Sequence, residues 1–412
     1  MFDFILRDAR LGGRDEILDI GVAGGRIAAL SPGLPEGAPS RSAEGRFVCS
    51  GFVDAHIHLD KALILDRCPI CQGTLQEAVS LTAKAKAGFT EEDVYARAET
   101  VLRQAIVSGT MAMRSFVETD PRVGLRSFEA LTRLKSDYAG MIDLDLCAFA
   151  QEGLTQEMAT HDLLVAALEG GATSVGGCPY TDPDPVAHID LVLDLAERFG
   201  VPADFHIDFD LDPEGSDLPA LIAAVKARGL QGRVSIGHVS KLSAMAPDRF
   251  DRLAGELAAA DIGLVVLPAT DLYLMGRDAD RLAPRGMAPA DRLARAGVRT
   301  AVATNNVMNP FTPFGDASLI RMANLFANVA QIGSDEEMAS AFAMVGERAA
   351  SVIGLARPET PEVGAPADLV VLDATSAAEA VRRIAQPIAG WKAGRQTFEH
   401  PLPTIVADKA GD

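Results

Sequence analysis

Positive charge is scarce in this sequence. Its 412 residues include 38 Lys and Arg against 57 Asp and Glu, which gives a formal net charge of −19 at pH 7. Nucleic acids and anionic membranes bind proteins through Lys and Arg, so this balance argues against both as partners. The composition instead fits a soluble enzyme whose partner is a small-molecule substrate.

Long apolar runs are also absent. No window approaches 18 uninterrupted apolar residues, the length that indicates a transmembrane helix. The N-terminal stretch 1–7 lacks the basic region and the following apolar region of a signal peptide. We therefore expect a cytoplasmic protein.

Cysteine and histidine are few. Five Cys in a chain of this length suggest reduced thiols, which again favours the cytoplasm. Cys68 and Cys71 have the C-x-x-C spacing, but no second pair follows them. We interpret this segment as a loop and not as a zinc ribbon.

The two ends of the chain share one pattern. Residues 2–31 contain short apolar runs separated by Gly-Gly pairs, which predict hairpin turns. Residues 367–398 contain similar short runs. Neither end can bury much surface alone, so we expect both to form one small β-sandwich domain from residues 1–50 and 360–412.

Between these ends, in residues 51–359, strand-like runs alternate with runs of helical spacing. Such alternation predicts parallel βα units, and eight units predict a closed (β/α)8 barrel of the TIM type, an α/β fold. The predicted strands are 52–60, 111–119, 143–151, 174–180, 203–209, 233–240, 263–270 and 299–305.

In such a barrel the active site lies at the carboxyl ends of the strands. His56 and His58 lie two residues apart near one strand end, so their side chains point the same way. His206 and His238 lie at two other strand ends. His56, His58 and His206 predict a site for one divalent metal ion, Zn or Fe, with His238 as a fourth ligand or as the partner of a bound water. No role is predicted for the other three, which lie in helical runs and in the tail: His161, His188 and His400.

A metal ion with an open position lowers the pKa of its water to near 7, which makes hydroxide available. Attack on an sp² carbon that carries nitrogen would then be hydrolysis or deamination. The competing interpretation is that the strand-end His residues serve packing alone.

Several stretches carry a resemblance to a known family. The chain resembles the amidohydrolase superfamily over nearly its whole length, and within it the cytosine deaminase branch, which also contains triazine-ring hydrolases. The matching stretches are Gly51–Lys61, Phe149–Gly153, Asp204–Asp208, Gly237-His238, Leu272–Arg277 and Val307–Gly315. The resemblance implies that His56, His58 and His206 are metal ligands, that His238 holds the attacking water or an intermediate, and that Gln151 hydrogen-bonds the ring.

Two positions differ from the family pattern. The strand-eight Asp that touches the metal and takes the water's proton is Asn305 here, and the Glu three residues after the strand-five His is Phe209. Asn can offer a carbonyl oxygen but cannot accept a proton near pH 7, and Phe can do neither. No Lys ends the fourth strand, where dinuclear relatives carry a carboxylated one, so we expect a single metal.

General acid–base groups contribute roughly 10²–10⁴-fold each. Either another group then moves the protons, or the chemistry differs, or the protein is a weak or inactive relative. Asp208 is the first candidate, since the alternation of a strand would point it the same way as His206. Asp210 and Glu152 follow. The alternative for Asp208 is a carboxylate that orients a ligating His.

Three cations lie at or just beyond strand ends: Lys61, Arg114 and Lys241. Together with the two missing acids, they predict a substrate that is anionic or carries acidic carbonyl groups. The alternative is that they pair with neighbouring carboxylates: Asp60, Asp120 and Asp208.

The sequence thus predicts a hydrolase of C–N bonds in a small, cyclic compound of cytosine-like or triazine-like type. The expected catalytic residues are His238, Asp208 and Asn305. The expected substrate-binding residues are Gln151, Lys61, Arg114 and Phe209. The long loops 63–74 and 271–289 would shape specificity.

Two other functions stay open. Asn305 and Phe209 favour a catalytically weak or silent relative that binds a small molecule. The second open function is that of a metal-independent lyase or isomerase with His238 or Asp208 as base. Members of this superfamily are often oligomeric, so we also expect a homo-oligomer.

Overall fold

The computed structural model describes residues 1–406. Its larger part is a parallel sheet of eight strands in which each strand pairs with its neighbour in sequence. The strands are β6 (Phe52–Ile57), β7 (Thr110–Glu118), β8 (Asp143–Ala150), β9 (Ser174–Gly177), β10 (Ala203–Ile207), β11 (Val234–His238), β12 (Gly263–Val266) and β13 (Thr300–Val302).

The sheet closes into a barrel at the segment that follows β13. Ile57 and Asn305 form a parallel bridge between β6 and this segment. The amide of His58 donates to the carbonyl of Asn305, and the amide of Asn305 donates to the carbonyl of His56, both at 2.8 Å. The (β/α)8 prediction is therefore confirmed, and the closing seam fixes Asn305 beside the two β6 histidines.

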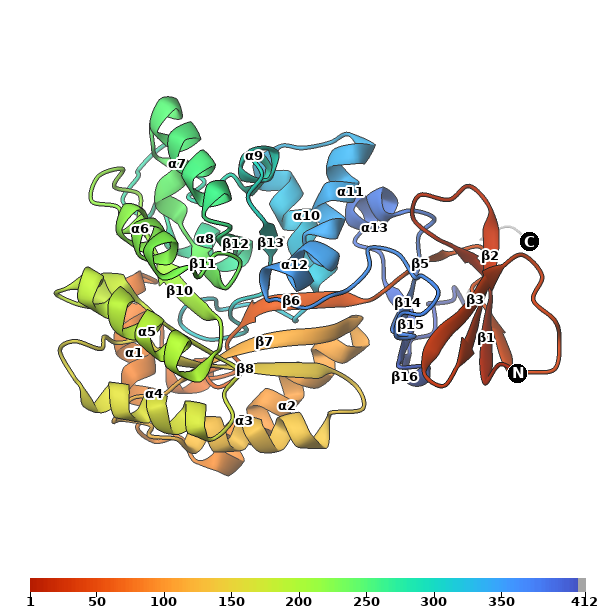
Figure 1. Ribbon diagram of the computed structural model, residues 1–412, viewed down its shortest axis with the longest axis horizontal. Coiled ribbons are helices and arrows are strands. Elements are labelled where there is room, and N and C mark those ends of the chain that lie inside the picture. The colour runs from red at the N-terminus through yellow and green to blue at the C-terminus, as the bar shows by residue number, and fades with distance from the viewer. Residues whose placement is uncertain (407–412) are drawn as a thin grey trace.

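Helices follow the strands and cover the barrel (Figure 1). They are α1 (Leu75–Lys86), α2 (Glu91–Val107), α3 (Arg126–Asp137), α4 (Ala159–Glu169), α5 (Pro185–Phe199), α6 (Leu218–Arg228), α7 (Pro247–Ala259), α8 (Pro268–Leu274), α9 (Ala290–Arg295), α10 (Leu319–Ala330), α11 (Asp335–Ala343) and α12 (Glu347–Val352). Among residues 1–406, no helix is both long and apolar enough to cross a bilayer.

Helix α5 illustrates how local sequence sets these elements. Asp184 caps its first turn by accepting a hydrogen bond from the amide of Ala187, and Pro185 occupies the first helical position. Gly200 ends the helix in a left-handed conformation, where glycine has no steric penalty. The face that includes Ile189 is buried, so capping and amphipathicity agree.

The smaller part is a mixed sheet built from both chain ends. Strand β5 (Phe47–Cys49) pairs antiparallel with β14 (Leu369–Leu372), which joins the two sets of strands. Figure 1 shows the N-terminal strands in red and the C-terminal strands in blue at one end of the molecule. The sheet also contains β1 (Phe4–Arg10), β2 (Ile17–Ala23), β3 (Arg26–Ser31), β4 (Ser40–Ser42), β15 (Pro387–Lys392) and β16 (Arg395–Glu399), and α13 (Ala377–Arg383) lies between β14 and β15.

The small domain formed from both ends is therefore confirmed, while its division at residues 50 and 360 stays a prediction. Some predicted strands are too long. Pro268 begins α8 inside the predicted strand 263–270, because proline is favoured at the first helical position and cannot donate to a ladder. The predicted strand 203–209 ends at Ile207, because the next residue, Asp208, has a φ of 51°.

Candidate active site

Three imidazoles meet at the carboxyl end of the barrel. His56 and His58 come from β6 and its end, and His206 comes from β10. One nitrogen atom of each lies within 4.8 Å of the others, and the ring centroids of His56 and His206 are 4.5 Å apart. The predicted trio is therefore brought together. Gly237 makes room for it, since a Cβ there would lie 2.9 Å from Cε1 of His56.

Burial keeps these imidazoles neutral. Their side chains are at most 2% exposed. Burial lowers the pKa of all three well below the usual range, and neighbouring positive groups lower it further. Neutral imidazole offers the lone pair that a metal ion requires.

Several buried atoms here have no hydrogen-bond partner within residues 1–406: both ring nitrogens of His56, Nδ1 of His58, Nε2 of His206 and Oδ1 of Asn305. Nδ2 of Asn305 donates to Oγ1 of Thr270 at 3.0 Å, which fixes the orientation of the amide. Unsatisfied buried acceptors cost free energy unless something binds them. One nitrogen from each of the three histidines, together with an amide oxygen, is a donor set that fits a divalent metal ion such as zinc or iron.

His238, at the end of β11, faces this trio with a defined tautomer. Its Nδ1 donates to Oδ1 of Asp271 at 2.7 Å, because an ionised carboxylate can only accept. Its Nε2 takes part in no hydrogen bond of the described chain, and its ring centroid is 5.2 Å from that of His206. His238 can therefore accept a proton through Nε2.

An apolar wall covers the histidines. The ring of Phe209 stacks on His238 with centroids 3.7 Å apart. Phe209 packs in a buried cluster with Ala78, Leu274 and Phe311. These residues therefore form an apolar side of the site next to His238. Phe209, a predicted substrate-binding residue, follows β10, and the other wall residues come from α1, α8 and the segment after β13. For these other residues the sequence indicated no individual role.

The polar side of the site is formed by Lys61 and Gln151. Nζ of Lys61 donates to Oε1 of Gln151 at 3.1 Å and to Oε1 of Glu118 at 2.6 Å. Nε2 of Gln151 is directed to Sγ of Cys178 at 3.2 Å. Both predicted substrate-binding residues are thus brought to the site, and their neighbours Glu118 and Cys178 were missed. Glu118 is the last residue of β7, so the strand-end rule could have found it.

Arg114 does not reach the site, which corrects the prediction that it binds substrate. It lies in the middle of β7, two residues before Phe116, whose ring contacts His56 with centroids 4.0 Å apart. Its guanidinium instead pairs with Asp145 at 2.6 Å and Asp204 at 3.1 Å. Alternation along the strand places Arg114 one layer below the imidazoles, where it has a structural role.

Asp208 is also placed differently from the prediction. The strand alternation with His206 fails because the backbone turns left-handed at Asp208. Its two carboxylate oxygens accept from Oγ of Ser216 at 2.5 Å and from the amide of Asp217 at 3.0 Å. Asp208 therefore orders a loop, and neither oxygen contacts an imidazole.

The other predicted charges pair with each other. Nζ of Lys241 lies 2.6 Å from Oδ1 of Asp210 and donates to two carbonyl groups of the same loop. Glu152 lies 2.5 Å from Nζ of Lys86. The proposed substitutes for the missing acids are thus engaged in ion pairs. Asp271, which no sequence pattern singled out, is the carboxylate that contacts a catalytic-site histidine.

Comparison with known proteins agrees with this geometry. Residues 178–398 match the model of the amidohydrolase family. The chain is 30% identical over 372 residues to a pterin deaminase of Rhizobium rhizogenes, covering 89% of this chain and 84% of that one. It is 26% identical over 404 residues to an N-isopropylammelide isopropyl amidohydrolase of a Pseudomonas strain, with 96% of each chain covered.

Solved structures give the same result. A 5-methylcytosine deaminase from Klebsiella pneumoniae has a TM-score of 0.92 at 27% identity, with 98% of this chain and 99% of that chain covered. An N-isopropylammelide isopropylaminohydrolase from Burkholderia multivorans has a TM-score of 0.85 at 26% identity, covering 96% and 98%. The predicted resemblance is confirmed: this chain belongs to the amidohydrolase family and is a hydrolase that acts on C–N bonds.

Proposed function

We propose that this hydrolase uses one divalent metal ion, zinc or iron, to remove an amine or ammonia from a small cyclic nitrogen compound. The observation that carries the proposal is the set of potential metal-ligand atoms at the barrel end, which are buried and have no hydrogen-bond partner within residues 1–406. His56, His58 and His206 would hold the ion, and Oδ1 of Asn305, on the segment bridged to β6, is buried without a hydrogen-bond partner within residues 1–406. A metal ion bound there supplies hydroxide near neutral pH by lowering the pKa of water.

The protein side of the reaction centres on His238. Its free Nε2 accepts a proton from the attacking water and returns it to the leaving nitrogen, while Asp271 stabilises the imidazolium that forms in between. In the balanced reaction the C–N bond breaks, the carbon gains the oxygen of water, and the nitrogen gains a proton. With this assignment, His238 carries out the proton transfers for which the chain lacks an acid at Phe209 and Asn305.

The surroundings support a flat ring as substrate. Phe209 and Phe311 offer aromatic faces, and Lys61 and Gln151 offer hydrogen bonds at one edge. Relatives named as pterin deaminase and as N-isopropylammelide amidohydrolase also act on ring compounds, as their names state. A cytosine-like or triazine-like ring is therefore the substrate class that we propose.

Metal analysis tests this proposal first. The protein is purified without a His tag or chelator, and its zinc and iron are measured together with activity toward aminopyrimidines, aminotriazines and pterins. About one equivalent of metal, removable and restorable together with activity, is expected. His206→Ala should abolish metal binding, whereas His161→Ala, at a partly exposed helical position, should not.

The silent binding protein is the second candidate, and Asn305 and Phe209 are the observations that favour it. If this second candidate is right, the protein binds ring compounds but does not turn them over, even at full metal occupancy. A protein that takes up no metal even on soaking would rule out the hydrolytic mechanism proposed here.

A further inference from the structure

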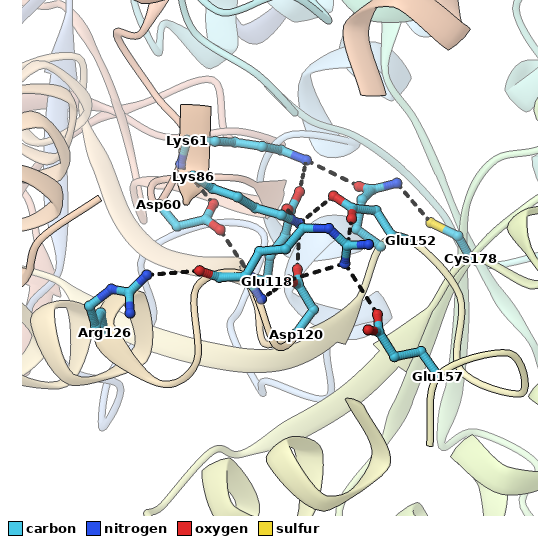
Figure 2. A network of polar contacts seen from close by, with 11 residues as sticks. Asp60, Lys61, Lys86, Glu118, Asp120, Arg126, Glu152, Glu157 and Cys178 are labelled. Carbon is cyan, nitrogen blue, oxygen red and sulfur yellow. Dashed lines mark hydrogen bonds and ion pairs between the residues drawn. The ribbon is translucent and has the colours of Figure 1, made fainter. Parts of the chain in front are cut away.

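Lys61 is held at the active site by a chain of buried ion pairs (Figure 2). It follows His58 by three residues, and its ammonium lies 4.4 Å from the ring centre of Phe311 in the apolar wall. After burial, its charge is the main cause that lowers the pKa of His58. Lys61 is therefore close both to His58 and to Phe311 of the apolar wall.

The ammonium of Lys61 has one N–H that donates to neither Glu118 nor Gln151. An ammonium carries three N–H donors, of which Glu118 and Gln151 take two. In the part of the chain that the structure describes, no third polar atom accepts from Nζ, and the ammonium lies over the ring of Phe311. The side chain of Lys61 is 2% exposed, so bulk solvent does not satisfy the third donor.

Glu118 joins Lys61 to a second lysine. Its Oε1 lies 2.6 Å from Nζ of Lys61, and its Oε2 lies 2.6 Å from Nζ of Lys86. Burial acts to raise the pKa of Glu118, but the two ammonium groups outweigh it and hold that pKa at about 2. Oδ2 of Asp60 accepts from the amide of Glu118, which fixes the backbone as well.

Lys86 is the last residue of α1 and is 1% exposed. Glu118, Asp120 and Glu152 all pair with its ammonium. Their oxygens have the spacing of a metal site, but Lys86 is the cation that they surround. Arg122 closes the network from the surface, 2.9 Å from Glu152. Since Ala78 of the same helix belongs to the wall, the network also anchors α1.

The charges of this network bear on the substrate. Three carboxylates face two ammonium groups, so Lys61 is already compensated by Glu118. A full anion placed beside it would meet the carboxylate that shares its charge, whereas a neutral carbonyl oxygen needs only the spare N–H. Of the two substrates expected from the sequence, one that is anionic and one that carries acidic carbonyl groups, this charge balance favours the second.

We propose that Glu118 and Lys86 are positioning residues that hold Lys61 so that its free N–H binds a neutral ring carbonyl of the substrate. The inference rests on the proposed function, because it assumes a ring at this site. Gln151 shares Lys61 as a partner and so is oriented by the same network.

Calorimetry with three rings tests the substrate part. Uracil presents neutral carbonyls, orotate adds a carboxylate, and pyrimidine has neither. The wild-type metal-loaded protein should bind uracil about 10-fold or more tightly than pyrimidine, because a hydrogen bond from a charged donor contributes roughly 10–100-fold. It should also bind uracil more tightly than orotate, because the carboxylate of orotate would face that of Glu118. Lys61→Met should remove this preference. Tighter binding of orotate, or no ring binding at all, would overturn the inference.

A double-mutant cycle tests the positioning part. Glu118→Gln should weaken uracil binding about 10-fold, and Lys61→Met with Glu118→Gln should bind no more weakly than Lys61→Met alone, because Glu118 acts through Lys61. Lys86→Arg should keep more affinity than Lys86→Met. Additive losses would overturn the positioning role.

Lys392→Met provides a matched control, since Lys392 is another buried lysine in carboxylate pairs, 2.7 Å from Asp368 and far along the chain in β15. It should lower the melting temperature without changing the preference among rings.

Metal content separates the two proposals. Normal metal content with no carbonyl preference overturns this inference alone, whereas absence of metal from the wild-type protein overturns the proposed function.

Discussion

Nδ1 of His238 lies 2.7 Å from Oδ1 of Asp271, and both side chains are buried. Asp271 supplies the charge that would stabilise a protonated His238. Asp271→Asn should lower kcat by about 10²-fold or more with little change in KM, because it weakens proton transfer and leaves the substrate contacts in place. Steady-state kinetics with parallel metal analysis measures this. A variant with normal kcat would show that His238 does not move the proton.

Asn305→Asp should restore a carboxylate beside His56 and His206. We expect tighter metal binding, because an ionised oxygen attracts a cation more strongly than an amide oxygen. Without metal, the same carboxylate would be buried and unpaired, which costs stability. The melting temperature of the variant should therefore fall more than that of the wild type when a chelator is added. Equal shifts would contradict the proposal that the side chain of residue 305 contacts the metal ion.

Asp208→Asn should reduce kcat by less than about 10-fold, below the range of a general acid or base. Both oxygens of Asp208 serve Ser216 and Asp217, so the variant should mainly loosen that loop. Ser216→Ala is the matched control and should resemble it. Limited proteolysis and kinetics on both variants provide the measurement, and a much larger loss for Asp208→Asn alone would return Asp208 to the catalytic residues.

Arg114→Met should destabilise the protein by about 3–5 kcal/mol, because it leaves Asp145 and Asp204 without their buried partner. The urea midpoint of unfolding reports this. KM should stay unchanged for the folded variant, since Arg114 lies one layer below the site. A raised KM at normal stability would instead support the substrate contact that the sequence suggested.

Glu347, at the start of α12, has a pKa that burial raises to about 7. The native state therefore binds its proton more tightly than the unfolded state, where the pKa is near 4.5. Stability should fall as pH rises from about 4.5 to 7 and stay reduced above 7. Glu347→Gln should raise the melting temperature relative to wild type more at pH 8 than at pH 4.5. Calorimetric scans at both pH values measure this, and an equal change at both would contradict it.

The sequence by itself determined the barrel, the pairing of the two chain ends, and most of the site. His56, His58, His206 and His238 could be predicted because alternation along a strand and the carboxyl-end rule are local regularities. Lys61 and Gln151 followed from the same rule. Hydrophobic periodicity and turn residues act over a few positions, so they can be read without a structure.

Tertiary structure decided which of these side chains face the site and what each one contacts. Arg114 and Glu118 lie on the same face of one strand, and only the stagger of the closed barrel places Glu118 at the site and Arg114 beneath it. Asp208 left the site through a left-handed backbone turn that no pattern indicated. The pairing of Asp271 with His238, and of Lys86 with Glu118, joins residues that are 33 and 32 positions apart. Such contacts depend on how strands and helices pack in three dimensions, which local sequence does not specify.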